Sequence, residues 1–148
     1  RLCPEQGIPS MGPDERQHIL LLVCDEAVCY RDIKDAPVLH HARSLLTHPQ
    51  QQFVDKQAPE RLELPAGRRA KITYSETADP FLSTRIQDLY GVTDDIKLAR
   101  GRHAVTIHIL APSQRPVQVT RSLKSFWTET YPGLKQQLAR QYPKHEWR

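Results

Sequence analysis

The chain lacks the features that mark several large classes of protein. Its 148 residues contain three cysteines, an odd number that suits a reducing cytoplasm better than a disulfide framework. The longest apolar run, residues 19–24, is far shorter than the roughly 18 residues that a membrane span needs. The opening residues also lack the charged-then-apolar order of an export signal. We therefore expect a cytoplasmic protein with no membrane partner, and the first residue, an arginine, suggests a fragment of a longer protein.

Signatures of catalysis are equally scarce. Six glycines stand against twelve prolines, and no glycine-rich loop, metalloprotease motif or nucleophile elbow occurs. Cys24, Cys29, His40 and His41 lie near one another, but their spacing matches no tight zinc site. The sequence therefore predicts no catalytic residue, no metal site and no cofactor within this chain. A free-standing enzyme with an unfamiliar site is the weaker alternative.

Charge, by contrast, is plentiful and unevenly distributed. Residues 1–96 carry 11 Lys and Arg against 15 Asp and Glu, a balance of −4. Residues 97–148 carry the other 10 basic residues and only 2 acids, a balance of +8. A strongly basic second half indicates an anionic partner for that half.

The first 58 residues have the pattern of a helical lead-in. Helical periodicity predicts helices over residues 15–30, 37–46 and 49–57, the first of them with Asp14 as its N-cap. The first helix is apolar enough to be buried against another part of a larger protein.

Residues 59–148 predict a small α+β domain. Alternating apolar residues predict one β-hairpin around "PAGRR" and a second around "APSQRP", with a further strand at residues 96–99. Asp79 and Pro80 read as the start of a helix that ends at Gly91, and two more helices follow at about 122–130 and 132–142. We expect a twisted antiparallel sheet built from the two hairpins, with helices packed on it.

Basic residues and aromatics need separate interpretations. Leu123, Phe126 and Trp127 have the spacing of a buried helical stripe, and Val117 with Val119 is expected to face inward from a strand. Basic residues in the turns, hairpins and helix starts are instead candidates for phosphate contacts in nucleic acid, although each one alone is more simply a solvated charge. These candidates are Arg68, Arg69, Lys71, Arg100, Arg102, Arg115, Arg121 and Lys124.

Four blocks of the chain also resemble a known family. "APERLELPAGRRAKITYS", "DPFLSTRIQDLYGV", "GRHAVTIHILAPSQRPVQVTRSLKSFW" and "YPGLKQQLARQYPKHEW" are similar, in order and spacing, to the C-terminal domain of HrpB-type bacterial ATP-dependent helicases. The resemblance implies a non-catalytic accessory domain of a DEAH-box, RNA-helicase-like protein. It implies nucleic acid, RNA above all, and the upstream helicase domains as partners, with ATP and Mg²⁺ bound only in the upstream motor.

A second functional hypothesis is open beside this one. The chain could serve as a protein-interaction module that docks through its apolar front helix and has no nucleic-acid role. That hypothesis predicts that a charge at Leu22 or Val23 abolishes association.

Overall fold

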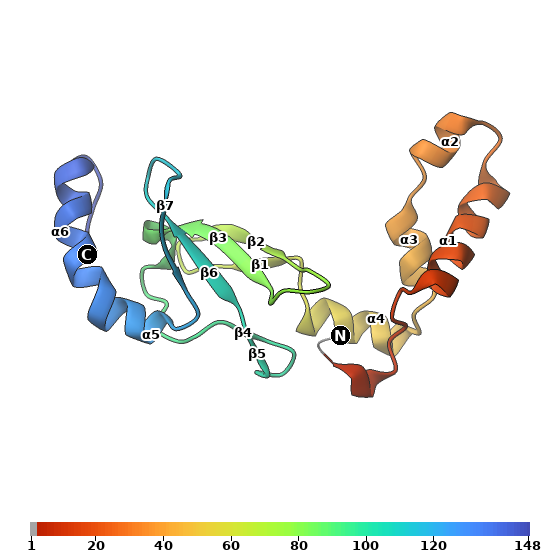
Figure 1. The fold of residues 1–148 in the computed structure, drawn as a ribbon, viewed down its shortest axis with the longest axis horizontal. Helices are drawn as coiled ribbons and strands as arrows, with labels where there is room; N and C mark the ends of the chain where they lie inside the picture. Colours follow the sequence, from red (N-terminus) through yellow and green to blue (C-terminus); the bar gives the residue numbers. More distant parts are fainter. Residues whose placement is uncertain (1–2) are drawn as a thin grey trace. The chain divides into compact units, whose positions relative to one another are not determined.

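The computed structural model describes residues 3–148 and divides the chain into two compact units (Figure 1). The first unit runs up to Lys56 and the second covers Gln57–Arg148. The sequence placed the division two residues later, between residues 58 and 59. Each unit is held together by contacts among its own residues.

The first unit is helical. Its elements are a 3₁₀ turn η1 (Pro4–Gln6), α1 (Pro13–Glu26), α2 (Tyr30–Lys34), α3 (Val38–Ser44) and α4 (His48–Gln57), whose last residue begins the second unit. The first helix starts and ends earlier than predicted. Gly12, not Asp14, is its N-cap, because Pro13 in the first turn already has the helical φ.

The helix α2 was not predicted. The pattern of residues 15–30 reads as one helix, but Ala27 is extended and ends α1. A new helix begins after Cys29, where the Asp32 Oδ2 atom accepts hydrogen bonds from the amides of Val28 and Cys29, each 3.0 Å long. These bonds stabilise the charged carboxylate and lower the pKa of Asp32.

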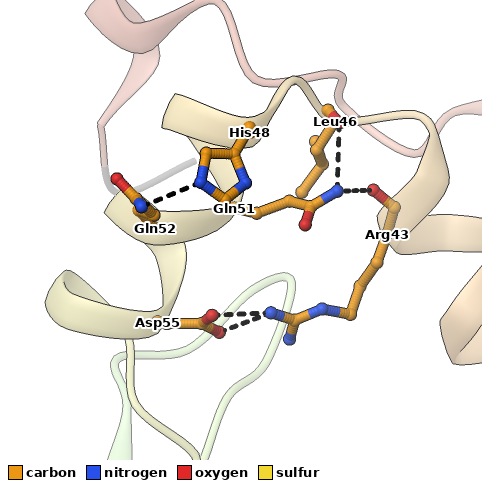
Figure 2. Close-up of polar contacts among 6 residues, drawn as sticks. All are labelled: Arg43, Leu46, His48, Gln51, Gln52 and Asp55. Carbon is orange, nitrogen blue, oxygen red and sulfur yellow. Dashed lines mark hydrogen bonds and ion pairs between the residues drawn. The ribbon is translucent and has the colours of Figure 1, made fainter.

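Polar contacts tie α3 to α4 in the first unit, as Figure 2 shows. The Arg43 Nη2 atom donates to both carboxylate oxygens of Asp55 at 2.7 Å. The Gln51 side-chain amide donates to the carbonyl oxygens of Arg43, in the last turn of α3, and of Leu46, just after that helix. The Arg43 carbonyl also accepts from the Leu46 amide at 3.0 Å, so Gln51 adds a side-chain hydrogen bond from α4 where the chain leaves α3.

The second unit combines seven strands with short helices. Its strands are β1 (Arg61–Glu63), β2 (Arg69–Thr73), β3 (Phe81–Arg85), β4 (Lys97–Leu98), β5 (His103–Ala104), β6 (Thr106–Leu110) and β7 (Pro116–Thr120). Its helical elements are η2 (Ile86–Leu89), α5 (Leu123–Ser125), the π-helical turn η3 (Phe126–Thr130) and α6 (Tyr131–Gln141). The predicted α+β class is confirmed, and both hairpins and the two final helices are present.

The sheet itself is mixed rather than antiparallel. Five strands have the order β1-β2-β3-β6-β7, and β3 runs parallel to β6, whereas β4 and β5 form a separate pair. The predicted helix at residues 80–90 is wrong: it is strand β3 followed by η2. Leu82, Thr84 and Ile86 are buried at a period of two, and pairing with two neighbouring strands outweighs the local helical pattern.

The core lies on one face of this sheet. Leu82, Ile107 and Ile109 are completely buried there together with Leu123, and Phe126 is 1% exposed. Trp127 packs against the same cluster, and its indole nitrogen donates to the Val92 carbonyl at 2.7 Å. The prediction that the aromatic helix residues belong to the core is therefore confirmed.

A β-bulge corrects the prediction for β7. Thr120, Val119 and Gln118 of β7 pair in regular order with Ile107, His108 and Ile109 of β6. The register then shifts by one residue between Ile109 and Leu110, so that Leu110 pairs with Pro116. The shift lets Val117 pack against the core, while Val119 lies 54% exposed beside His108. The two valines therefore do not share the inward face.

Candidate nucleic-acid interface

The other face of the five-stranded sheet is not covered. Side chains alternate between the two faces of each strand, so every second residue of β1, β2, β3 and β6 lies opposite the core. We call this surface the open sheet face. It consists of Arg61, Glu63, Arg69, Lys71, Thr73, Phe81, Ser83, Arg85, Thr106, His108, Leu110 and Val119. All of these residues are exposed or partly exposed, and none is buried.

Positive charge dominates the open sheet face. Four of its residues are basic and one, Glu63, is acidic. Arg69 and Lys71 belong to the predicted set, and Arg61 lies directly across the β1–β2 ladder from Lys71. Within residues 3–148, Arg61, Arg69 and Lys71 form no ion pair. These cations therefore face solvent as a group on one surface.

Arg85 completes the basic set from β3. When the Gln114 side-chain amide is placed with its oxygen towards Arg85, that oxygen accepts hydrogen bonds from Arg85 Nε at 2.6 Å and from Arg85 Nη2 at 3.1 Å. Gln114 lies in the β6–β7 loop and has a positive φ of 67°. The sequence prediction missed Arg85 because it placed residues 80–90 in a helix. The available signal in the sequence was the alternation of Phe81, Ser83 and Arg85 with Leu82, Thr84 and Ile86, which the structure buries.

An aromatic pair occupies the centre of the open sheet face. The rings of Phe81 on β3 and His108 on β6 are stacked, with centroids 4.8 Å apart and planes inclined by 15°. Both residues are partly exposed, and Val119 lies across the ladder from His108. Neither ring was singled out from the sequence.

Arg68 lies on the opposite side of its hairpin from Arg69. Arg68 lies two residues before the buried Ala70 and four before the buried Ile72, so it belongs to the same face as they do. Its Nη1 atom lies 3.4 Å from Asp88 Oδ2. The same Asp88 oxygen accepts a hydrogen bond from the buried Thr84 hydroxyl at 3.2 Å. Arg68 therefore belongs to an ion pair at the edge of the core, away from Arg69 and Lys71.

The other predicted cations are dispersed. Arg121 pairs with Asp79, and Lys124 is exposed on α5. Arg115 lies in the β6–β7 loop, where its carbonyl accepts from the Ala111 amide at 2.9 Å. The structure thus places two of the eight predicted residues, Arg69 and Lys71, together on the open sheet face.

Arg100 and Arg102 lie in the tight turn between β4 and β5. Ala99, Arg100 and Gly101 all have positive φ values, of 52°, 59° and 81°. The Arg100 amide donates to the Gln57 side-chain oxygen at 2.7 Å, which holds this strained turn in place. These two arginines therefore belong to the turn of the small second sheet and not to the five-stranded sheet.

Metal-ligating groups do not assemble in the described part of the chain. Among residues 3–148, no three His, Cys, Asp or Glu side chains lie close enough together to hold a metal ion. Cys24 and Cys29 are exposed and free, and the buried His41 lies 3.8 Å from Glu26. None of the described helices combines the length and the apolar character that crossing a membrane requires.

Comparison with known proteins identifies the family. Residues 20–148 match the family model described as "ATP-dependent helicase C-terminal". The chain is 34% identical over 117 residues to the ATP-dependent RNA helicase HrpB of Escherichia coli K12, covering 79% of this chain but 14% of that protein. Two crystal structures are similar to it: the E. coli DExH-box NTPase HrpB has a TM-score of 0.72 at 27% identity, and the E. coli DEAH/RHA helicase HrpB has 0.70 at 31%. They match 92% and 90% of this chain, which covers 20% and 17% of theirs. The chain belongs to the family of C-terminal domains of HrpB-type ATP-dependent helicases.

Proposed function

We propose that this domain provides a nucleic-acid contact surface to an ATP-dependent helicase, and that the surface is the open sheet face. The observation that carries the proposal is the uncovered basic surface, with four cations against one acid. Lysine and arginine side chains on such a surface neutralise backbone phosphates and release counterions, which gives affinity that is independent of sequence and sensitive to salt.

The division of labour follows from the size of the relatives. The chain spans about a seventh of the length of E. coli HrpB, since it covers 14% of that protein. ATP and Mg²⁺ would bind in other domains of the longer protein, and this domain would extend the path of the strand. The relative's description as an RNA helicase favours RNA as the ligand. The three free cysteines favour a reducing cytoplasm as its location.

The test is a titration of the chain with a fluorescent single-stranded RNA at two salt concentrations. Four phosphate contacts predict a slope of about −2.8 for log K against log salt, or an affinity loss of about 50-fold between roughly 50 and 200 mM salt. Arg69→Glu with Lys71→Glu removes two contacts and should make the slope shallower, with a magnitude of about 1.4 or smaller.

A matched control has the same change of net charge elsewhere. Arg140→Glu with Lys144→Glu reverses two exposed cations on and just after α6. The control should retain the wild-type slope. Affinity that is indifferent to salt, or equal losses in both double variants, would contradict the proposal.

The first unit supports a second candidate function, docking on other domains of the same helicase. Seven of the nine large apolar residues that are exposed within residues 3–148 lie in this unit, among them Leu20 at 60%, Leu21 at 61% and Val28 at 96%. The residues proposed from the sequence are unsuitable for a test, because Val23 is 4% exposed and Leu22 partly buried. A charge there would disturb the helical packing itself.

Exposed positions provide the sharper experiment on docking. Leu20→Glu with Leu21→Glu should abolish association of this chain with the rest of the helicase, expressed separately, because apolar contact area is lost without damage to the core. Gln17→Glu, also exposed on α1, is the control. Association that survives the double substitution would reject docking through α1.

A further inference from the structure

We infer that the stacked pair of Phe81 and His108 binds unpaired bases, so that the domain selects single-stranded over double-stranded nucleic acid. The inference rests on the proposed function of the open sheet face and adds a ligand class to it. Aromatic rings on an exposed sheet surface bind bases by stacking, because every base has a flat π-face. The two rings share the open sheet face with four cations, which is the combination that single-strand binders use.

The surroundings of the pair leave its rings accessible. Phe81 lies between Thr73 on β2 and Thr106 on β6, and His108 lies between Ser83 on β3 and Val119 on β7. These four neighbours have short side chains. The two rings are therefore the largest groups at the centre of the open sheet face, and a flat ligand meets no bulkier side chain beside them.

Charges lie where the sugar–phosphate backbone of such a strand would pass. On β3, Arg85 lies four residues from Phe81 on the same face, with only the exposed Ser83 between them on that face. On β2, Lys71 and Arg69 lie two and four residues from Thr73, the cross-strand partner of Phe81. Successive residues on one face of a strand are about 7 Å apart, so the cations lie within side-chain reach of a strand whose bases stack on the pair.

The arrangement explains why an aromatic pair occupies a solvated surface. Phe81 and His108 do not belong to the core cluster on the other face, so the pair is not needed to fill the interior. In a duplex the faces of the bases are hidden by their neighbours, and only their edges and the phosphates remain for contact. A stacking pair therefore gains nothing from duplex and discriminates in favour of unpaired strands.

The experiment distinguishes binding through the bases from binding through the phosphates. Wild-type chain is titrated with a single-stranded oligonucleotide, with the same strand carrying abasic residues, and with a duplex of equal length, at one salt concentration. One stacked base predicts that the intact strand binds about 5- to 150-fold tighter than the abasic strand. Phe81→Leu and His108→Leu should remove most of this difference while the salt slope persists. Tyr30→Leu, which removes an aromatic side chain 79% exposed in the first unit, should leave it unchanged.

Each outcome bears on one claim. Equal affinity of the wild-type chain for intact and abasic strands, with the salt slope present, overturns the stacking inference and leaves the proposed function standing. Absence of binding to all three ligands overturns the proposed function, and the stacking inference fails with it. Circular dichroism and thermal melts of the two leucine variants show that any loss comes from a folded domain. The inference also fails if both variants are folded and retain the preference for the intact strand.

Discussion

Arg68 and Arg69 are adjacent in the chain, but the structure predicts opposite consequences for their removal. Arg68 Nη1 lies 3.4 Å from Asp88 Oδ2, and the Arg68 side chain is 51% exposed whereas that of Asp88 is 14% exposed. A pair of this kind, half in solvent, contributes about 0.5–1 kcal/mol to the free energy of unfolding. Arg68→Ala should therefore destabilise the domain by that amount and leave nucleic-acid affinity unchanged.

Arg69→Ala should show the reverse. Its side chain lies on the open sheet face, so the free energy of unfolding should change by less than about 0.5 kcal/mol. The loss of one phosphate contact should reduce the slope of log K against log salt by about 0.7. Urea denaturation measures the first quantity and RNA titration at several salt concentrations the second.

Asp88→Ala extends this comparison. It removes both the partner of Arg68 and the acceptor of the buried Thr84 hydroxyl, so it should cost about 1–3 kcal/mol more than Arg68→Ala. If Arg68→Ala lowers the affinity and the slope as much as Arg69→Ala does, the assignment of the two arginines to different faces is refuted.

Further predictions concern the core, the bulge and one tyrosine. Phe126→Ala should lower the free energy of unfolding by about 3–5 kcal/mol in urea titrations, since the ring is 1% exposed, and a loss below 1 kcal/mol would contradict its place in the core. Val117→Ala should cost about 1 kcal/mol and Val119→Ala less than about 0.5, because the bulge turns only the former inward; equal costs would argue against the bulge. Burial raises the pKa of Tyr74 to about 12, and its hydroxyl donates to the Pro59 carbonyl at 2.8 Å. The folded state therefore favours neutral Tyr74. Its contribution to stability is present below pH 10 and is lost as the pH rises towards 12. Tyr74→Phe should remove this pH dependence from thermal melts measured at alkaline pH.

Much of the second unit could be predicted because its local patterns agree with its final contacts. The β1–β2 and β6–β7 hairpins alternate apolar and polar residues around turn sequences, and this pattern depends on neighbours within one hairpin. The stripe of Leu123 and Phe126 was predictable for the same reason. Two cations of the open sheet face, Arg69 and Lys71, followed directly from the alternation in β2.

The failures occurred where long-range pairing decided the outcome. Residues 80–90 have a helical spacing of apolar residues, but β3 is held by an antiparallel partner on one side and a parallel partner on the other. That parallel pairing brings Phe81 next to His108, which lies far along the chain. Neither residue could be assigned to an interface while residues 80–90 were expected to be helical.

The sequence by itself determined the α+β class, the helical lead-in, both hairpins, the buried aromatic helix and the resemblance to helicase C-terminal domains. These properties depend on periodicity, turn chemistry and the order of motifs, all of which are local in the chain. Only the tertiary structure decided which charges and rings share a surface. The face on which a strand residue lies depends on register, a bulge and the strand's partners. These factors separated Arg68 from Arg69 and placed Arg85, Phe81 and His108 on the same face as Lys71.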